Sequence, residues 1–580
     1  MNTTIKLTSA QVSENIKNLQ SFMSKHKLEQ FYVSSFDIYL NEYVPLEDCH
    51  RFYMTGFTGS TAELLVPSSG KPRLYVDGRY HEQADLECDL SIVEVVKVPA
   101  NQGVLSTLEC DLAKASPKIV GMEGDRAAVS LYERVSSEFK VELFNNQELA
   151  SVIDFAPMAS FGKIQHLAKE LTGESTGEKL ERIFTDKSKA YYITALDSLA
   201  WITNCRGYHL PNNCAFVGTG FATHDKVYAF IDSAIEVECP DDKIEFINCK
   251  GPEVEEKLLA ISKNYKLSEV YIDKNALNTA SYLMLTSVFG EKKLAAKVGG
   301  LIDFHSIKTD AELDLVRKAF KQGDKAIYNT VCWVKEQVKN GIKISELDLY
   351  HQTTKSYQEE GCKEQSFNTI SGVGANGSII HYGDPKADVF ISDESMVLLD
   401  SGGYFDSGFA TDTTRTFMGS TKEGSEEQKR IYTYVLKSAL ACQNAIFKSG
   451  TRGSGLDAIT RQPMYQAGYD YAHGTGHGVG LNVHESGAGI GPTRTYLMKP
   501  GQVVSIEPGI YIPGFGGVRI ENISIVKEHP EFEGFLCFEN LVYIGFEKQL
   551  IDESLLTAQE KVWLEEYEAE CVKRGTSFLQ

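Results

Sequence analysis

The sequence lacks both a hydrophobic run long enough to cross a bilayer and a basic stripe suited to nucleic acid. No uninterrupted apolar stretch approaches the roughly 18 residues of a membrane span, and the opening MNTTIKLTSA has neither the basic start nor the apolar stretch of a signal peptide. Lys and Arg number 58 against 79 Asp and Glu, a formal net charge of −21 that repels polyphosphates. We therefore expect a cytoplasmic protein without membrane or nucleic-acid partners.

Paired cysteine motifs are also missing. The 12 cysteines are scattered from Cys49 to Cys571 with no CxxC pair, which favours reduced, mostly buried thiols over a disulfide framework or a structural zinc cluster. The composition, 42% hydrophobic and 24% charged, excludes wholesale disorder. A length of 580 residues exceeds what one core sustains, so two to four domains are expected.

Two stretches of the N-terminal half resemble each other. One begins FYVSSFDIYLNEY at Phe31 and continues through RFYMTGFTGSTAELLV and RLYVDGRYHEQA; the other begins AYYITALDSLAWITNCRG at Ala190 and continues through CAFVGTGFATHDKVYAFID. Each has an apolar strand, an aspartate before a helical segment, a glycine break and two further strands. This favours two tandem α/β domains. The alternative is coincidence, because the order strand, Asp, helix is common in α/β proteins.

Changes in the pattern of apolar residues, proline and glycine along the chain predict three domains, at residues 1–155, 156–307 and 308–580. The segment 151–163, SVIDFAPMASFGK, interrupts the first pattern with a proline and small residues. From Thr309 to Gly341 apolar residues recur at helical spacing, which predicts a long amphipathic helix with its N-cap at Thr309 or Asp310. Short apolar strands between Gly-rich turns follow, and a last helix over 557–575 closes the chain. The third domain is therefore expected to be α+β.

Five ionisable side chains of the third domain lie at strand ends or glycine breaks, where a bare charge is costly unless it is paired or binds a metal. This five-residue cluster consists of Asp400, Asp412, His477, Glu507 and Glu521. Each member alone has an ordinary explanation, such as a turn cap or an ion pair. Together, four carboxylates repel one another and need compensating cations. Two divalent ions, Mn²⁺ with Co²⁺ or Zn²⁺ as alternatives, suit this set and would activate water for hydrolysis.

Three further histidines accompany the five-residue cluster: His381 in SIIHYG, His473 four residues before His477, and His484 in LNVHE. Neutral imidazoles donate hydrogen bonds to an oxyanion or move a proton to a leaving nitrogen. Each of them alone has a surface or core position as its alternative explanation. The segment HGTGHGVGLNVHE, with three histidines separated by small residues, favours a functional role.

The segment HGTGHGVGLNVHE, residues 473–485, resembles the signature of proline-directed metallopeptidases with the pita-bread fold, and in particular the long, three-domain cytosolic form of the aminopeptidase P (Xaa-Pro aminopeptidase) family. The likeness covers nearly the whole chain. TGFTGS (55–60) and DGRY (77–80) are similar to the first domain of that family, ALDSLAW (195–201) to the second, and IIHY, DSG, TDTTRT, SIEPG and VRIEN, in that order, to the catalytic domain. The resemblance implies two tandem creatinase-like N-terminal α/β domains followed by a pita-bread catalytic domain.

By the same resemblance, the five-residue cluster holds a dinuclear manganese site. Asp412 and Glu521 are implied to bridge both ions, Asp400 to hold one ion, and His477 and Glu507 to hold the other. Glu507 is also implied to take the proton of the attacking water as general base.

Four residues match substrate-site residues of the family. His381 and His484 are implied to contact the substrate around the scissile bond and to take part in catalysis. His473 is implied to line the pocket near the proline, and Arg519 to orient the site.

Two departures from the family pattern are visible. The family usually has ten residues between the two aspartates, whereas Ser401–Thr411 has eleven. A one-residue slip within a strand would turn a ligand to the opposite face, so we expect the extra residue in the turn around Tyr404 to Gly408 or in a β-bulge. The family's EPGYY also reads EPGIY here, with Ile510 in place of an aromatic residue.

The implied activity is that of a manganese-dependent aminopeptidase that removes the N-terminal residue from peptides whose second residue is proline, as a homodimer formed through the catalytic domain. A prolidase, which cleaves Xaa-Pro dipeptides, is one alternative, and two tandem N-terminal domains argue against it. A catalytically inactive peptide-binding relative is the other. Such relatives normally lose metal ligands, whereas all five are present here.

Overall fold

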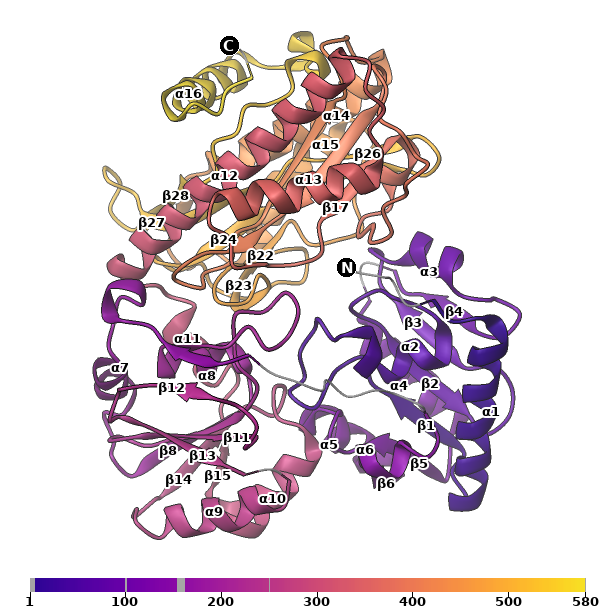
Figure 1. Ribbon diagram of the computed structural model, residues 1–580, viewed down its shortest axis with the longest axis vertical. Coiled ribbons are helices and arrows are strands. Elements are labelled where there is room, and N and C mark those ends of the chain that lie inside the picture. The colour runs from indigo at the N-terminus through magenta and orange to yellow at the C-terminus, as the bar shows by residue number, and fades with distance from the viewer. Residues whose placement is uncertain (1–5, 100–101, 154–161, 250, 579–580) are drawn as a thin grey trace. The chain divides into compact units, whose positions relative to one another are not determined.

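The computed structural model describes residues 6–99, 102–153, 162–249 and 251–578 (Figure 1). The chain divides into two compact units, one of residues 1–169, 174–211 and 215–302 and the other of residues 170–173, 212–214 and 303–580. The predicted boundary between residues 155 and 156 lies outside the described residues. The predicted boundary between residues 307 and 308 falls shortly after the start of the second unit and remains a prediction.

The first α/β domain is built on a six-stranded mixed sheet with the order β4-β3-β2-β1-β5-β6. Its strands are β1 (Gln30–Val33), β2 (Glu63–Pro67), β3 (Arg73–Val76), β4 (Glu94–Lys97), β5 (Ile119–Glu123) and β6 (Lys140–Phe144). Its helices are α1 (Ser9–His26), α2 (His50–Thr55), α3 (His81–Glu87), α4 (Val104–Ala115), α5 (Val129–Glu138) and α6 (Asn146–Leu149). Phe31 and Val33 of the central strand pack with α1, whereas Tyr32 packs with α4 and α5. Both faces of the sheet are therefore covered.

The second α/β domain repeats this topology. Its main sheet has the order β13-β11-β10-β8-β14-β15, and the central β8 pairs antiparallel with β10 and parallel with β14, as β1 does with β2 and β5. The strands are β7 (Ile164–His166), β8 (Lys189–Ile193), β9 (Cys205–Arg206), β10 (Thr219–Ala222), β11 (Val227–Ile231), β12 (Val237–Glu238), β13 (Ile244–Asn248), β14 (Glu269–Ile272) and β15 (Leu294–Ala296). The helices are α7 (Thr176–Ile183), α8 (Leu196–Thr203), α9 (Glu253–Ser262), α10 (Thr279–Phe289) and α11 (Ile302–His305). The predicted duplication is confirmed.

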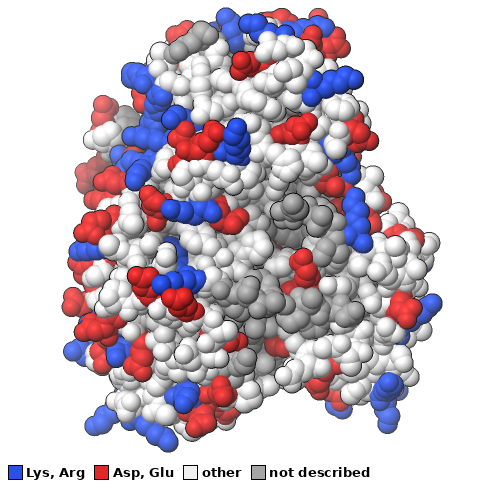
Figure 2. Space-filling view, viewed as in Figure 1, with Lys and Arg blue, Asp and Glu red and all other residues white. Residues whose placement is uncertain are grey.

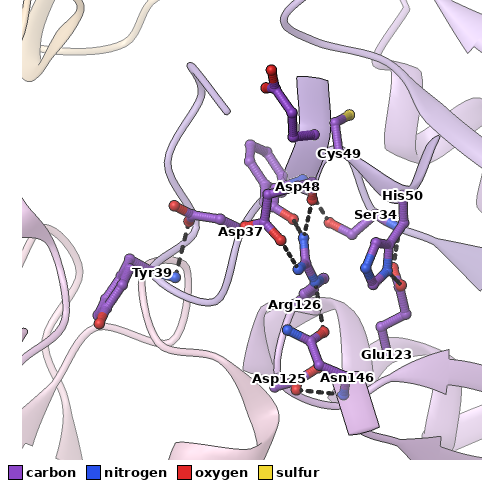
Figure 3. Close-up of polar contacts among 12 residues, drawn as sticks. Ser34, Asp37, Tyr39, Asp48, Cys49, His50, Glu123, Asp125, Arg126 and Asn146 are labelled. Carbon is purple, nitrogen blue, oxygen red and sulfur yellow. Dashed lines mark hydrogen bonds and ion pairs between the residues drawn. The ribbon is translucent and has the colours of Figure 1, made fainter. Parts of the chain in front are cut away.

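A buried polar network ties the strand ends of the first domain together (Figure 3). Arg126, just after β5, donates from Nη2 to Oδ1 of Asp48 at 2.6 Å and from Nε to Oδ1 of Asn146 at 2.8 Å. Glu123, the last residue of β5, accepts from the backbone N–H of Ser34 at 2.6 Å and pairs with Nδ1 of His50. Because Glu123 is fully buried, these donors are needed to keep its carboxylate satisfied.

The second unit mixes helices with largely antiparallel sheets, as predicted for the third domain. Its sheets have the orders β17-β18-β20 and β21-β28-β27-β24-β22-β23, with the two-stranded pairs β16-β19 and β25-β26. The helices are α12 (Asp310–Lys339), α13 (Glu346–Glu359), α14 (Glu426–Gln443), α15 (Gly453–Gln466) and α16 (Ala558–Arg574). The strands are β16 (Glu364–Gln365), β17 (Ile370–Val373), β18 (Met396–Ser401), β19 (Gly403–Tyr404), β20 (Thr413–Met418), β21 (Phe447–Lys448), β22 (Gly476–Gly478), β23 (Glu485–Ile490), β24 (Val503–Ile506), β25 (Gly509–Ile512), β26 (Gly516–Arg519), β27 (Asn522–Glu528) and β28 (Phe535–Asn540).

The predicted long helix is confirmed as α12. Thr309 accepts a hydrogen bond from the backbone N–H of Glu312, and the Glu312 carboxylate accepts one from the backbone of Thr309, so the helix begins with a capping box. Beyond its last turn, Gly341 has φ of +71°, a conformation that favours glycine. The predicted last helix is likewise confirmed as α16, capped by Thr557 and ended at Gly575.

Membrane-spanning helices are absent from the part of the chain that the structure describes, because none of its helices is both long and apolar enough to cross a bilayer. On the face that Figure 2 shows, basic side chains are interspersed with acidic ones.

Candidate metal centre

The β18–β20 hairpin places the two aspartates on one side of a sheet. Asp400 lies directly opposite Thr414 in the antiparallel register. Asp412 precedes Thr414 by two residues, so its side chain faces the same way. Both residues are buried, at 7% and 5% exposure, and burial together with the negative charge of Asp400 raises the pKa of Asp412. The hairpin therefore brings the two predicted ligands together.

The extra residue between the aspartates lies in the turn of this hairpin. The register of β18 and β20 is unbroken, and it continues beyond the strands to a bridge between Tyr404 and Ala410. The chain reverses between them, where the N–H of Gly408 donates to the carbonyl of Phe405 at 2.9 Å. Of the two predicted positions, the turn is confirmed. The extra residue lengthens the tip of the hairpin, and the two aspartate side chains still point to the same side of the sheet.

His477 and Glu507 reach the aspartates from the neighbouring sheet. His477 is the middle residue of β22, Glu507 follows β24, and Nε2 of His477 lies 3.4 Å from Oε1 of Glu507 and 3.5 Å from Oδ2 of Asp412. Ser505 links the two strands, accepting from the backbone N–H of His477 at 2.9 Å and donating to Glu507 Oε1 at 3.1 Å. Nδ1 of His477 lies 3.0 Å from the carbonyl of Gly478. A proton on Nδ1 leaves the Nε2 lone pair facing the carboxylates, as a metal ligand requires.

Glu521 completes the cluster from the short break between β26 and β27. Its Oε2 accepts a 2.8 Å hydrogen bond from Oγ1 of Thr414, and its backbone N–H donates to the carbonyl of the same threonine at 3.2 Å. Thr414 thus holds Glu521 against the hairpin that carries the aspartates. One potential ligand atom from each of Asp412, His477 and Glu521 lies within 4.8 Å of the others.

The electrostatics of the cluster fit bound cations. Burial and the charges of neighbouring carboxylates raise the pKa values of Asp412 and Glu521 well above their usual range. Oδ1 of Asp400, Oδ1 of Asp412 and Oε1 of Glu521 are buried with no hydrogen-bond partner among the described residues. Buried oxygens left in this state are costly, and divalent ions would satisfy all three while offsetting the repulsion. The residues present therefore fit the metal site expected from the sequence.

Arg519 connects the cluster to a second group of side chains. Its Nη2 donates to Oδ2 of Asp400 at 2.6 Å, and its Nη1 donates to Oη of Tyr511 at 2.8 Å. The same Tyr511 hydroxyl lies 2.9 Å from Nε2 of His473, whose Nδ1 lies 2.7 Å from the carbonyl of Gly474. Burial raises the pKa of Tyr511 to about 12, so the hydroxyl keeps its proton. A continuous chain of contacts therefore runs from a carboxylate of the cluster to the predicted pocket histidine.

Of the two histidines expected at the scissile bond, His484 adjoins the cluster, and His381 follows a residue whose carbonyl lies near Arg519. The rings of His484 and His477 are 4.3 Å apart and meet edge to face. His381 lies in the turn after the 3-10 helix Gly374–Ser378, and Nη1 of Arg519 lies 3.4 Å from the carbonyl of its neighbour Ile380. Both histidine side chains are partly exposed, unlike the aspartates. They are placed where a substrate could reach them.

Sequence reasoning missed three residues that support the site: Thr414, Ser505 and Tyr511. Thr414 lies two residues after Asp412, and Ser505 lies two residues before Glu507. Because side chains alternate along a strand, each of them points to the same side as its neighbouring ligand. Tyr511 is the final residue of EPGIY, in which the sequence distinguishes Glu507 as a candidate ligand and Ile510 as a departure from the family pattern. Ile510 is 2% exposed and belongs to the core of the domain, whereas the tyrosine next to it faces the site.

Comparisons with known proteins agree with this arrangement. Residues 314–528 match metallopeptidase family M24, residues 15–154 and 156–312 each match a creatinase/prolidase N-terminal domain, and residues 534–580 match the C-terminal region of peptidase M24. A probable Xaa-Pro aminopeptidase P from Laccaria bicolor is 32% identical over 98% of this chain and 91% of its own length.

Solved structures extend the likeness to the whole fold. The X-prolyl aminopeptidase from Caenorhabditis elegans, described as a cytosolic enzyme with a di-nuclear active site, superposes with a TM-score of 0.87 at 25% identity and covers 97% of this chain and 96% of its own. An Xaa-Pro dipeptidase from Bacillus anthracis, also 25% identical, covers 98% of its own chain and 64% of this one, with a TM-score of 0.51. The predicted fold class, two creatinase-like N-terminal domains followed by a pita-bread domain, is confirmed. The chain belongs to metallopeptidase family M24 and, within it, to the family of the Xaa-Pro aminopeptidases P.

Proposed function

We propose that this chain is a metal-dependent Xaa-Pro aminopeptidase, which hydrolyses the peptide bond between an N-terminal residue and a penultimate proline. One observation carries the proposal: the five-residue cluster converges, and three of its buried carboxylate oxygens have no hydrogen-bond partner among the residues that the structure describes. The named relatives that cover nearly the whole chain support the choice of substrate.

Two divalent ions would be held by the five-residue cluster, with Asp412 and Glu521 shared between them. When bound, the ions would offset the carboxylate charges, lower the pKa of water and polarise the scissile carbonyl. Mn²⁺ is the proposed metal, because an oxygen-rich set with a single imidazole suits a hard or borderline ion and contains no thiolate. The relative from Caenorhabditis elegans is described with a di-nuclear site, which supports the number of ions.

Glu507 is proposed to be the general base. Its carboxylate is 18% exposed, more than that of Asp400 or Asp412, and Oε1 accepts a hydrogen bond from Ser505 and lies 3.4 Å from Nε2 of His477. A carboxylate in this position can take a proton from the attacking water and deliver it to the leaving nitrogen. That nitrogen belongs to the proline ring and, like any amide nitrogen, has to gain a proton to leave as an amine.

The remaining residues are proposed to bind the substrate. His381 and His484 would donate hydrogen bonds around the scissile bond, where negative charge develops on the carbonyl oxygen. His473 and the ring of Tyr511, 5.5 Å apart between centroids, would line the pocket for the proline ring. Arg519 would fix this wall relative to the cluster through its bonds to Asp400 and Tyr511.

Location and assembly are proposals as well. We propose that the protein acts in the cytoplasm, which the description of the Caenorhabditis elegans relative as cytosolic supports. We also propose a homodimer formed through the catalytic domain, on the family resemblance. Sedimentation equilibrium at micromolar concentration measures the assembly, with a mass near twice 64.4 kDa expected.

Two other functions are less well supported. The Xaa-Pro dipeptidase from Bacillus anthracis covers 64% of this chain, whereas the aminopeptidase structure covers 97%, which favours the aminopeptidase. An inactive peptide-binding relative has no need of the complete cluster that this chain retains.

A panel of peptides tests the proposed function. With Mn²⁺ present, Xaa-Pro-Xaa tripeptides are expected to be cleaved after the first residue, Xaa-Ala-Xaa controls to be resistant, and Xaa-Pro dipeptides to be poor substrates. Preferential cleavage of the dipeptides would instead identify a prolidase. Binding of the tripeptides without turnover by metal-loaded protein would identify an inactive relative.

A further inference from the structure

A buried ion pair lies directly behind the histidine segment of the site. Glu485, which follows His484, pairs through Oε2 with Nζ of Lys308, and its Oε1 lies 2.9 Å from Nδ1 of His305. The Lys308 and Glu485 side chains are only 1% and 2% exposed. Burial opposes ionisation, yet the Lys308 ammonium and the His305 contact hold the pKa of Glu485 below its usual value. A charged carboxylate is therefore built into the interior here.

The Glu485 carboxylate fills the inside of the loop that joins β22 to β23. A Cβ added to Gly480 would lie 1.9 Å from Oε1 of Glu485, so the glycine makes room for the carboxylate. On the opposite strand of the hairpin, Gly478 pairs with Glu485 just after His477, and His484 immediately precedes Glu485. The carboxylate therefore fixes, from within, the loop that holds the two facing histidine rings.

The other end of the ion pair rests on a rigid part of the domain. Lys308 immediately precedes the capping residue of α12, and its backbone N–H donates to the carbonyl of Gly501 at 3.0 Å, in the turn before β24. A Cβ added at Gly501, where φ is +88°, would lie 2.9 Å from the carbonyl oxygen of Lys308. The backbone of Lys308 is thus anchored to both the start of α12 and the turn before β24, the strand that leads to Glu507.

We propose that Glu485, held by Lys308 and His305, is a positioning residue that sets His484 against His477. The inference rests on the proposed function. Glu485, the first residue of β23, is buried, whereas His484 in the bend just before it is partly exposed, so the carboxylate lies on the inner side of the segment and acts through that histidine. A displacement of about 1 Å in a reacting group costs on the order of 10²-fold in rate. Loosening the ion pair is therefore expected to slow the chemical step without removing a group that touches the substrate.

A double-mutant cycle tests this role. Glu485→Gln, nearly the same shape without the charge, should lower kcat by about 10-fold or more while KM stays within about twofold and both metals remain bound. In a His484→Ala background the same Glu485→Gln change should alter kcat by less than about twofold, because the group that it positions is already absent. Lys308→Met should reproduce the loss, and the Glu485→Gln, Lys308→Met double variant should be no slower than either single variant.

A matched control separates positioning from a general loss of stability. Glu560→Gln weakens a partly buried ion pair with Lys437 between α14 and α16 in the same unit and should leave kcat unchanged at a comparable loss of melting temperature. Equal effects of Glu485→Gln in the wild-type and His484→Ala backgrounds would overturn the proposal, as would wild-type kcat in folded Glu485→Gln. Should Glu485→Gln fail to fold, the cycle is run with Lys308→Met, and failure of both would make the pair a folding element and also overturn it.

The double-mutant cycle can be interpreted only if the wild-type enzyme hydrolyses Xaa-Pro-Xaa peptides, so a failure of the proposed function is detected first. If the wild type does not hydrolyse them, crystal structures test the positioning role instead. A changed separation of the His477 and His484 rings in Glu485→Gln, compared with 4.3 Å in the wild type, supports positioning, and an unchanged separation overturns it.

Discussion

Arg519 donates a 2.6 Å hydrogen bond from Nη2 to Oδ2 of Asp400, and both side chains are buried. The guanidinium offsets one negative charge of the five-residue cluster, and Oδ1 of Asp400 has no hydrogen-bond partner within the described part of the chain. Because a second donor of Arg519 reaches Tyr511, the same side chain sets the position of the His473 wall. The five-residue cluster and the side chains proposed to line the proline pocket are thus parts of one hydrogen-bonded structure.

The Tyr511 hydroxyl is the link that can be removed most cleanly. Tyr511→Phe deletes the bridge between Arg519 and His473 while keeping the ring. We expect both metals to remain bound, and kcat/KM for Xaa-Pro-Xaa peptides to fall by roughly 10-fold, as for the loss of one hydrogen bond to a charged group. Ile510→Val, an adjacent core change, is the control and should leave kcat/KM within about twofold. Unaltered kinetics in Tyr511→Phe would show that the hydroxyl plays no part in orienting the pocket.

The histidines should separate by role. His477→Ala removes the only imidazole of the five-residue cluster, so metal content and activity should fall together. His381→Ala and His484→Ala should keep two metals and lose roughly 10²-fold in kcat/KM, the usual scale for a positioned proton donor or oxyanion contact. Elemental analysis beside steady-state kinetics measures both quantities. Wild-type kinetics in metal-loaded His381→Ala and His484→Ala would exclude both histidines from the reaction.

Metal removal should destabilise the second unit. Without cations, the buried carboxylates repel one another and destabilise the folded state. An ion that binds only the folded state stabilises it. Adding Mn²⁺ at 100 times its Kd is expected to stabilise the fold by about 2.7 kcal/mol and to raise the melting temperature. Asp412→Asn, with less charge to offset, should show a smaller rise. A melting curve that does not move across the titration would contradict a metal-binding cluster.

Asp324 of α12 should make stability depend on pH. Burial raises its pKa to about 7, and Oδ1 has no hydrogen-bond partner among the described residues, while Oδ2 accepts from the N–H of Tyr543 at 2.8 Å. Between pH 4 and 7, roughly, the unfolded chain ionises at this position and the folded chain does not. Stability should therefore fall as pH rises through this window, by at most about 1.4 kcal/mol per pH unit from this group.

The variant Asp324→Asn removes that ionisation. Relative to the wild type, it should gain stability at pH 8 compared with pH 5, as measured by urea unfolding at both values. A difference between variant and wild type that is the same at the two pH values would contradict the raised pKa.

Most of the architecture is predictable because local sequence patterns indicate its helices, strands and turns. The 3.6-residue spacing and the Thr309 capping position define α12, and the repeated order of strands and glycine breaks reveals the duplicated domain. The cluster itself is predictable because its members lie at the ends of short apolar strands, where a charge is costly unless it is paired or binds a metal. These signals depend on neighbours in sequence.

The rest depends on contacts that sequence order hides. The extra residue of the hairpin could be assigned to the turn only when the unbroken register was seen, since a bulge has the same spacing. The ion pair of Glu485 with Lys308 joins positions 177 residues apart, and nothing in the histidine segment that ends at Glu485 points to Lys308 as its partner. The role of Tyr511 could not be predicted either, because an aromatic residue beside a buried isoleucine is expected in the hydrophobic core. Only the structure shows its hydroxyl between Arg519 and His473.

The central claim is that the five-residue cluster is a two-metal hydrolytic centre, and one titration tests it most directly. Protein stripped of metal is supplied with increasing Mn²⁺, and the metal bound per chain is measured beside the rate of Xaa-Pro-Xaa hydrolysis. The account predicts negligible hydrolysis without metal and a maximum rate at two bound ions per chain. Full activity in protein that elemental analysis finds free of metal would contradict it.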